Sequence, residues 1–438
     1  MLNRHAYQDL LAWKRTKTHQ GLLVTGARQV GKTTLVRAFG HDQYEHVAEL
    51  NFLGNTTAVQ TLSQARDTKD LLLRLSVLVE GELVPEKTLV FLDEVQEFRD
   101  ILTWLKFLEE STDFDFVLSG SMLGVDLYDV RSYPVGFVDE LKMHPLTFFE
   151  FCEGAGLGQE VLGVVLECFD AREAVPDFIH ERLMGLYYDY LLVGGMPDAA
   201  NTFVETSDLA RVRAVQRGIF DAYEHDISKY VEGAVDRRHI KTIYEAIPNQ
   251  LNAPNKRFKF TKLGKDARFS HMQTAFDWLE HAGVALAALR TTEPTYPLGI
   301  HADTSSFKLF MNDVGLLTSR LMGNVDIEIL NRRSSMNYGS IFENAAAQEL
   351  RARGFELFYY NQTSVGEVDF LVQDRMGGVS LIEIKSGKDY KRHRATSKLL
   401  STKNYSFANV FVFRDGNVEV DGQVTYLPIY MIGCLGGA

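Results

Sequence analysis

Hydrophobic and polar positions follow two different periods along the first 150 residues of the chain. Segments of strand length recur there, at residues 22–24, 47–52, 88–92, 114–118 and 137–141. Between them, residues 67–79 and 101–110 carry apolar side chains at every third or fourth position, which predicts helices. Strands that alternate with helices predict a parallel α/β sheet. The run at residues 88–92 is apolar throughout, as is typical of a central strand buried on both faces.

The pattern changes after residue 150. Residues 152–240 are mostly helical by periodicity and contain no motif with an evident chemistry. Short helices are then predicted at residues 243–251, 261–269 and 270–281, and strands at 284–289 and 307–311. Three helices and a hairpin are typical of a winged helix.

In the last hundred residues, the apolar positions again show both helical and strand periods. Residues 339–353 predict a helix, and residues 367–372 and 380–385 predict two strands joined by a loop around Met376. A chain of 438 residues is too long for one ordinary domain. The pattern therefore predicts four regions: a parallel α/β domain at 1–150, a helical connector at 151–239, a winged-helix-like domain at 240–330 and an α/β domain at 335–438.

Composition narrows the class of protein. Hydrophobic residues make up 45% and charged residues 24% of the chain, which is ordinary for a globular protein. The net charge of -12 argues against non-specific coating of nucleic acid. Cys152, Cys168 and Cys434 are too widely spaced for a metal motif or a disulfide framework, which favours the reducing cytoplasm. Residues 1–18 have no unbroken apolar core, so they predict an amphipathic helix and no membrane segment.

A phosphate-binding loop is the clearest chemical motif. Residues 26–34 read G-A-R-Q-V-G-K-T-T, which fits G-x-x-x-x-G-K-[ST] between a strand and a helix. The predicted nucleotide-binding residues are Gly26, Ala27, Arg28, Gln29, Val30, Gly31, Lys32, Thr33 and Thr34. Backbone N–H groups would surround the phosphates of ATP, Lys32 would reach the β- and γ-phosphates, and Thr33 would ligate Mg²⁺. The alternative is a glycine-rich turn that matches by chance, but strand, loop, Lys-Thr and helix occur in the required order.

Polar residues at the ends of two later strands complete this candidate site. Asp93 and Glu94 follow the apolar run at residues 88–92, where ligands bind in open α/β sheets. Asp93 is predicted to hold Mg²⁺ through water, and Glu94 to activate the water that attacks the γ-phosphate. Ser119 ends the next strand and would sense the γ-phosphate, unless it only ends the strand in a turn.

These motifs resemble those of prokaryotic AAA-type ATPases that carry a C-terminal domain of unknown function, DUF4143. The matching segments are G-A-R-Q-V-G-K-T-T-L, F-L-D-E-V-Q, L-S-G-S, P-L-T-F-F-E-F and L-V-G-G-M-P. The resemblance implies an additional-strand P-loop fold with ATP and Mg²⁺, a winged-helix region and a nuclease-like C-terminal module. This chain has Phe137 where the family usually has arginine. If that arginine contacts nucleotide, its absence either weakens hydrolysis or transfers its task to Arg131 or to a neighbouring subunit.

The C-terminal region contains a second polar constellation. Glu343 shares a helix face with Ala346, Ala347 and Leu350, so its carboxylate points inward and needs a partner. A hairpin symmetric about Met376 would place Asp369 opposite Glu383, with Lys385 on the same face.

This constellation resembles the site of restriction-endonuclease-like nucleases of the PD-(D/E)XK type. That resemblance predicts a divalent metal on Asp369, Glu383 and Glu343, with Lys385 as a catalytic residue. The alternative is a structural ion-pair network on a degenerate nuclease fold.

Two basic clusters suggest nucleic acid as a partner. Lys256, Arg257, Lys259, Lys262, Lys265 and Arg268 face a single acid, Asp266. This cluster would suit duplex DNA, or it is a solvated face of a protein-docking winged helix. A second cluster, Lys388, Lys391, Arg392, Arg394 and Lys398, would suit phosphate contacts.

The sequence thus leads to a function hypothesis and an alternative. The first is Mg²⁺-dependent ATP hydrolysis coupled to movement of a DNA-binding or nuclease-like C-terminal half. The second is a non-hydrolysing, ATP-dependent switch that binds a protein partner or forms a homo-oligomer.

Overall fold

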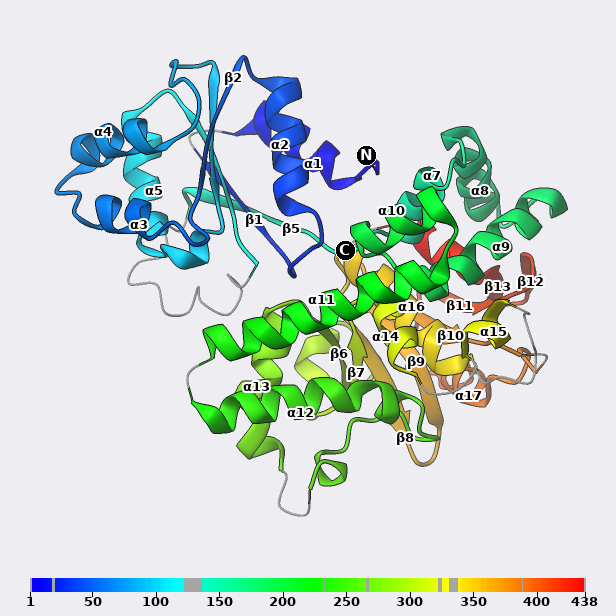
Figure 1. Cartoon of the computed structure of the whole chain (residues 1–438). Helices are drawn as coiled ribbons and strands as arrows, with labels where there is room; N and C mark the ends of the chain where they lie inside the picture. Colours follow the sequence, from blue (N-terminus) through cyan, green and yellow to red (C-terminus); the bar gives the residue numbers. More distant parts are fainter. Residues whose placement is uncertain are drawn as a thin grey trace. The chain divides into compact units, whose positions relative to one another are not determined.

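The computed structural model of the chain describes residues 2–17, 20–121, 136–231, 233–264, 268–321, 325–330, 338–387 and 389–436. These residues form two compact units, which are described separately (Figure 1). The N-terminal unit comprises Arg4–His144 and His281–Gly283. The C-terminal unit comprises Met1–Asn3, Pro145–Glu280 and Val284–Ala438.

The N-terminal unit is built on a five-stranded parallel sheet with the order β2-β3-β4-β1-β5. Its strands are β1 (Gly21–Thr25), β2 (His46–Asn51), β3 (Thr88–Asp93), β4 (Asp115–Ser119) and β5 (Val138–Lys142). Strand β4 lies between β1, which leads into the phosphate-binding loop, and β3, which ends in Asp93. This insertion is the additional-strand arrangement, so the predicted parallel α/β fold is confirmed.

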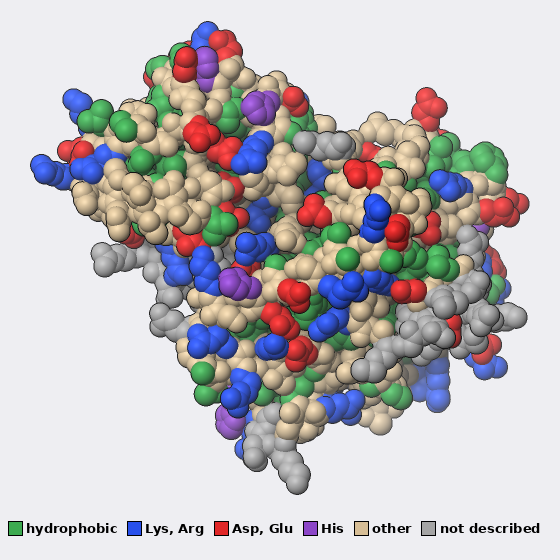
Figure 2. Space-filling view, viewed as in Figure 1, with side chains coloured by type: hydrophobic (Ala, Val, Ile, Leu, Met, Phe, Trp, Pro, Cys, Tyr) green, Lys and Arg blue, Asp and Glu red, His purple; other side chains and the backbone are tan. Residues whose placement is uncertain are grey.

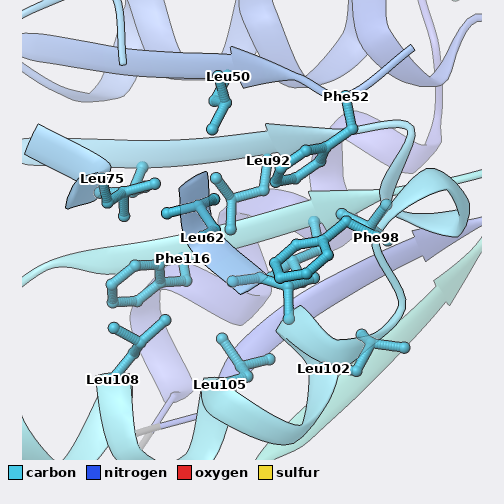
Figure 3. Packing of buried hydrophobic residues seen from close by; sticks show 14 of the residues in the cluster. Leu50, Phe52, Leu62, Leu75, Leu92, Phe98, Leu102, Leu105, Leu108 and Phe116 are labelled. Carbon is cyan, nitrogen blue, oxygen red and sulfur yellow. The ribbon is translucent and has the colours of Figure 1, made fainter. Parts of the chain in front are cut away.

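Among its described residues, the helices of this unit are α1 (Ala6–Thr16), α2 (Lys32–Gln43), α3 (Thr56–Ser63), α4 (Thr68–Leu78) and α5 (Asp100–Ser111). Helix α5 buries Ile101, Leu102, Leu105 and Leu108, whose spacing puts them on one face. They pack with Phe116 of β4 and Leu92 of β3 in the cluster of Figure 3. Each such side chain contributes about 1.5–3 kcal/mol by leaving water. This packing holds the strands that carry the candidate site.

The C-terminal unit is organised around an eight-stranded mixed sheet with the order β12-β13-β11-β10-β9-β8-β6-β7. Its strands are β6 (Ala285–Thr291), β7 (Ala302–Met311), β8 (Phe358–Gln362), β9 (Gly366–Gln373), β10 (Val379–Ile384), β11 (Asn409–Arg414), β12 (Glu419–Asp421) and β13 (Val424–Pro428). Strand β6 pairs in parallel with β8, while β6 and β7 form an antiparallel hairpin.

The β6–β7 hairpin therefore belongs to the same sheet as the C-terminal strands, and not to a separate winged-helix domain as the sequence predicted. Residues 285–288 and 306–311 are buried on both faces of these strands. A wing exposes one face to water, whereas a strand with two buried faces needs cover on both. This difference explains why one compact unit spans the predicted boundary near residue 330.

Helices surround this sheet. They are α7 (Phe148–Gly154), α8 (Gln159–Ala171), α9 (Asp177–Val193), α10 (Pro197–Thr206), α11 (Leu209–Tyr230), α12 (Ala234–Leu251), α13 (Phe269–His281), α14 (Val314–Arg320), α15 (Val325–Leu330), α16 (Gly339–Ala352) and α17 (Arg394–Leu400). The short 3-10 helices among the described residues are η1 (Val95–Glu97), η2 (Phe260–Lys262), η3 (Leu298–His301) and η4 (Ile429–Cys434). Helix α12 packs on β7, and α16 contacts β6, β7 and β10 (Figure 1).

One predicted helix is wrong. Within the described residues, the segment 261–269 holds only the end of the 3-10 turn η2 and the first residue of α13. Just before it, the backbone N–H of Phe258 donates to the Phe307 carbonyl, and the rings of Phe258 and Phe260 are buried. The segment itself begins in η2, where the N–H of Leu263 donates to the Phe260 carbonyl, and this bond closes a 3-10 turn instead of an α-helix.

The charge distribution on the surface and the polarity of the helices are those expected from the composition. Basic and acidic side chains are interspersed on the face shown in Figure 2. Among the described residues, every helix is too short or too polar to cross a membrane.

In the L-V-G-G-M-P motif, α9 ends at Val193, and the following glycine pair packs against the buried carboxylate of Asp313. Gly194 has φ 75°, and a Cβ there would lie 2.2 Å from Asp313 Oδ1. The N–H of Gly195 donates to Asp313 Oδ2 at 2.5 Å, and the N–H of Leu316 donates to Asp313 Oδ1 at 2.9 Å. Burial raises the pKa of Asp313 to about 6, against the effect of these hydrogen bonds. The glycine pair is therefore required by close packing.

Gly194→Ala should lower the unfolding midpoint of the C-terminal unit strongly, with a loss of about 3 kcal/mol or more, because the new methyl group would overlap Asp313. Gly218→Ala is the matched control, since Gly218 lies inside α11 with open space around its Cα. This control should be neutral or stabilising by up to about 1 kcal/mol. Urea unfolding followed by circular dichroism measures both, and equal stability of the two variants would contradict the packing argument.

Candidate functional site

The phosphate-binding loop connects β1 to α2 and depends on glycine at both ends. Gly26 has φ 131°, and a Cβ there would lie 2.2 Å from the carbonyl oxygen of Met143. Gly31 has φ 94° and caps the N-terminus of α2 in the left-handed region. Gln29 also has a positive φ, 64°. These conformations turn the loop back over the start of α2, as an anion-binding loop requires.

The side chain of Lys32 lies against this loop. Its Nζ donates to the carbonyl oxygens of Gly26 and Ala27, both at 2.9 Å, and the residue is 6% exposed. Arg4 holds the loop from the outside by donating to the carbonyls of Val30 at 2.6 Å and His144 at 2.7 Å. The sequence contained no signal for Arg4, since an isolated arginine before a helix is common.

Asp93 is the point at which the polar strand ends converge. It ends β3, is 1% exposed, and accepts a hydrogen bond from Thr33 Oγ1 at 3.0 Å. Asn51 Nδ2 donates to the same oxygen at 2.9 Å, and the Ser119 hydroxyl donates to Oδ1. The structure thus brings together Thr33, Asp93 and Ser119 as the sequence placed them, and adds Asn51.

Asn51 was missed because an amide at a strand end is common. It is nevertheless the parallel register partner of Asp93, so a correct order of the strands would have revealed it.

Glu94 and Gln96 form the outer part of this site. Glu94 has φ 57°, a left-handed conformation that is uncommon outside glycine and is often found at functional sites. Gln96 Nε2 donates to the Glu94 carboxylate. Gln96 Oε1 is buried and has no hydrogen-bond partner within the described residues, so it is a spare acceptor next to the acid. The donor set and the adjacent Thr33 and Asp93 oxygens fit a nucleotide with Mg²⁺.

Phe137, which occupies the position of the family arginine, has an aromatic ring instead of a cation. The ring of Phe137 lies beneath Lys106, with Nζ 4.8 Å from the ring centroid. The backbone carbonyl of Phe137 accepts the N–H of Gly21. Arg131, the alternative cation considered from sequence, lies outside the described residues.

In the C-terminal unit, the β9–β10 hairpin has the register expected from sequence. The pairs Val379↔Gln373 and Ile382↔Phe370 are both symmetric about Met376. Continued by one residue, this register puts Glu383 opposite Asp369, and the backbone N–H of Ile384 donates to Asp369 Oδ2 at 2.8 Å. The two carboxylates therefore lie at the same level of neighbouring strands.

A lysine that sequence reasoning missed lies at the centre of this cluster. Lys308 of β7 is 0% exposed. Its Nζ lies 2.6 Å from Glu367 Oε1, 3.5 Å from Glu343 Oε2 and 3.8 Å from Asp369 Oδ1. Lys256 forms an ion pair with the other oxygen of Glu343. The available signal was a single charge inside the apolar run Phe307 to Met311.

The charges of this cluster are mutually stabilised. Burial would lower the pKa of Lys308, but Glu343, Glu367 and Asp369 raise it above its ordinary value. Burial would raise the pKa of Asp369, but Lys308 and Lys256 hold it below its ordinary value. The buried ammonium and this carboxylate are therefore both charged at neutral pH.

Glu383 lies at the other side of the cluster. Lys385 Nζ donates to Glu383 Oε2 at 3.0 Å, and the Thr396 hydroxyl donates to Oε1 at 2.8 Å. Burial and the charge of Asp369 raise the pKa of Glu383 to about 7.

The predicted metal set of Glu343, Asp369 and Glu383 is not assembled. In the part of the chain that the structure describes, no group of three or more His, Cys, Asp or Glu side chains is arranged to hold a metal ion. The physical reason is that facing carboxylates need a cation, and lysine ammonium groups already supply it. Lys308 contacts Glu343 and Asp369, and Lys385 contacts Glu383.

The basic segment of the middle region is only partly a surface feature. Arg257, Lys259, Lys262 and Arg268 are exposed, whereas Lys256 turns inward to Glu343. Lys265 of this segment and Lys388 of the C-terminal basic cluster lie outside the described residues.

The fold and the loop of the N-terminal unit are those of a P-loop domain of the AAA type. A family model for an AAA domain matches residues 18–152, and one for DUF4143 matches residues 338–432. A third, for the domain of unknown function DUF8612, matches residues 184–326. The chain therefore contains an AAA domain followed by a C-terminal DUF4143 domain, in the order that the sequence motifs implied.

Solved structures with distant similarity include a Walker-type ATPase of Pyrococcus abyssi, with 14% identity, 73% of this chain and 96% of that chain covered, and a TM-score of 0.44. The RuvB Holliday junction branch migration motor of Thermotoga maritima has 14% identity, coverage of 65% and 89%, and a TM-score of 0.30. The ORC1 protein of Aeropyrum pernix, in complex with DNA, has 11% identity, coverage of 75% and 95%, and a TM-score of 0.28. No curated protein sequence matches the chain.

Lys308→Met should destabilise the C-terminal unit by about 3–5 kcal/mol at pH 8, because Glu343, Glu367 and Asp369 would be deprived of their shared cation. Without Lys308, which lowers the pKa of Glu343 and of Asp369, the pKa of these two carboxylates rises in the folded state. A raised pKa favours folding at low pH and opposes it as the pH increases, so the deficit should shrink towards pH 5.

Urea unfolding at both pH values, with and without EDTA, measures this effect. Lys403→Met, a change at an exposed lysine, is the control and should be near neutral. A Lys308→Met variant as stable as wild type at pH 8, or a wild type weakened by EDTA, would contradict the role of the ammonium.

Proposed function

We propose that the N-terminal unit binds ATP with Mg²⁺ and hydrolyses it. The observation that carries this proposal is the approach of the Thr33 hydroxyl to Asp93, 3.0 Å apart, beside the loop that holds Lys32. Bound Mg²⁺ supplies charge neutralisation at the phosphates. Thr33 would ligate the ion directly and Asp93 through water, and Lys32 would exchange its carbonyl partners for phosphate oxygens.

Glu94 is the proposed general base. Its carboxylate follows the Mg²⁺-binding strand end directly, so it would accept a proton from the attacking water. Gln96 would orient Glu94, because its amide already donates to that carboxylate. Asn51 and Ser119 are proposed as positioning residues, since both hold the carboxylate of Asp93. Ser119 would sense the γ-phosphate through this contact.

Coupling to the C-terminal unit is the second part of the proposal. ATP hydrolysis would change the conformation of the C-terminal half and thereby its hold on a partner, for which duplex DNA is the first candidate. Support comes from the exposed side chains of Arg257, Lys259, Lys262 and Arg268 around the buried rings of Phe258 and Phe260. A protein partner or a second copy of the chain is the alternative.

One observation favours a non-nucleolytic role for the C-terminal unit. The carboxylates of the lysine-filled cluster already have ammonium partners, so we propose a degenerate nuclease fold used for binding rather than cleavage. Cys152, Cys168 and Cys434 are free thiols, which supports the proposal of a reducing, cytoplasmic location.

Lys32→Ala should abolish ATP binding, because it removes the cation that the loop offers to the phosphates. Glu94→Gln should bind ATP like wild type but hydrolyse it at least about 100-fold more slowly, since the base is neutralised while the loop is intact. Isothermal titration measures binding and single-turnover phosphate release measures hydrolysis. Lys69→Ala, at an exposed lysine of α4, is the control. Equal ATP affinity of wild type and Lys32→Ala would refute the assignment.

Replacing Arg257, Lys259, Lys262 and Arg268 by alanine should weaken duplex binding and flatten its salt dependence by roughly one unit of slope for each phosphate that is no longer neutralised. The control removes four exposed positive charges elsewhere, at Lys69, Lys87, Arg375 and Lys403. Fluorescence anisotropy between about 50 and 200 mM salt gives the slope. An unchanged slope in the first variant would favour docking of a protein partner.

A further inference from the structure

A cavity of 330 Å³ opens beside the polar cluster of the C-terminal unit. One wall is the turn between β8 and β9 with Glu367, and another is the end of β10 with Glu383 and Lys385. The third wall consists of residues 392–395 and Lys398, at and before α17. All of these residues belong to the same compact unit.

The walls are held together by direct contacts. Lys398 Nζ donates to the carbonyl of Ser364 at 2.5 Å, which ties α17 to the β8–β9 turn. Gly366 in that turn has φ 116°, and a Cβ there would lie only 3.2 Å from Ala395 Cβ. The Thr396 hydroxyl fixes Glu383 from the same helix. The cavity is therefore a built feature of the fold, with little need to rearrange around a ligand.

The lining carries an excess of positive charge. It contains the cationic side chains Lys385, Arg392, Arg394 and Lys398 against the carboxylates of Glu367 and Glu383, an excess of two positive charges. Glu367 is also neutralised by Lys308 at 2.6 Å. Burial lowers the pKa of His393, so this lining residue is neutral at pH 7.

The contacts of Lys398 and Arg392 within the protein do not cancel their positive charges, which can therefore act on a ligand in the pocket. The ammonium of Lys398 is bound to a neutral carbonyl. The ion pair of Arg392 with Asp389 spans 3.5 Å between side chains that are 84% and 79% exposed, so it contributes little.

We propose that this pocket binds the phosphate of a nucleotide-sized phosphomonoester without a metal ion. A phosphomonoester carries about -1.5 to -2 charges at pH 7, which matches the excess on the lining. Arginine and lysine side chains are the groups that recognise phosphate. The cavity lies near the lower end of small-molecule sites, about 300 Å³, so its volume suits one nucleotide.

Binding needs no divalent metal because the nearby carboxylates already have ammonium partners. The phosphate would come from a free nucleotide or from the 5′ end of a nucleic-acid strand. This inference does not depend on ATP hydrolysis at the phosphate-binding loop.

The test uses the full chain with Lys32→Ala, so that binding at the phosphate-binding loop does not contribute. The probe is a single-stranded tetranucleotide with a 3′ fluorophore, in its 5′-phosphorylated and 5′-hydroxyl forms, followed by anisotropy at fixed salt with EDTA. The phosphorylated form should bind at least tenfold more tightly. Arg394→Ala with Lys398→Ala should remove this preference.

The matched control is Lys391→Ala with Lys403→Ala, which removes the same charge close by in the sequence. Lys391 is paired with Glu419 at 2.6 Å and does not line the cavity. This control should keep the preference within about twofold, and circular dichroism would verify that both variants fold.

Competition with adenosine monophosphate separates the two sources. Full displacement of the probe at similar concentration assigns the pocket to free nucleotides, and its failure assigns the pocket to strand ends. Equal binding of the phosphorylated and hydroxyl forms, an equal decrease in both double variants, or failure to bind in EDTA would each overturn the proposal.

Discussion

The buried ammonium group of Lys308 constrains the whole C-terminal unit. A cation that is fully removed from water is tolerated only where carboxylates surround it, because desolvation costs several kcal/mol. Its partners come from two other elements: Glu343 lies on α16, and Glu367 and Asp369 lie on β9. The helix, the central hairpin and the strand pair at the sheet edge must therefore be in register with one another before any one of these charges is satisfied.

The N-terminal unit solves a similar problem with neutral donors. Asp93 is as buried as Glu343 beside Lys308. It accepts hydrogen bonds, however, from the hydroxyl and amide groups of Thr33, Asn51 and Ser119. None of these three donors carries a full positive charge, so a cation can still be added next to Asp93. The two buried acidic sites thus differ in whether their cation is part of the polypeptide, and this difference separates a nucleotide site from a structural core.

The sequence pattern correctly predicted features that depend on residues close together in the chain. The phosphate-binding loop, the strand-end acids and the hairpin register about Met376 all follow from spacing within about 15 residues. Lys308 and Asn51 escaped because their roles arise only when distant strands are paired, and the sequence does not state which strands are neighbours. The β6–β7 hairpin was assigned to a winged helix for the same reason, since its two buried faces become evident only beside β8.

The eight-stranded sheet joins strands from two segments that match different family models, so the two segments are expected to evolve together. The segment 184–326 supplies Lys308 and Lys256, whereas the segment 338–432 supplies the carboxylates that enclose them. A DUF4143 segment transplanted without its preceding partner would expose the edge of β8 and leave buried acids facing one another. These two segments therefore need each other to fold, although sequence comparison assigns them to separate families. Recombination that separates them should be selected against.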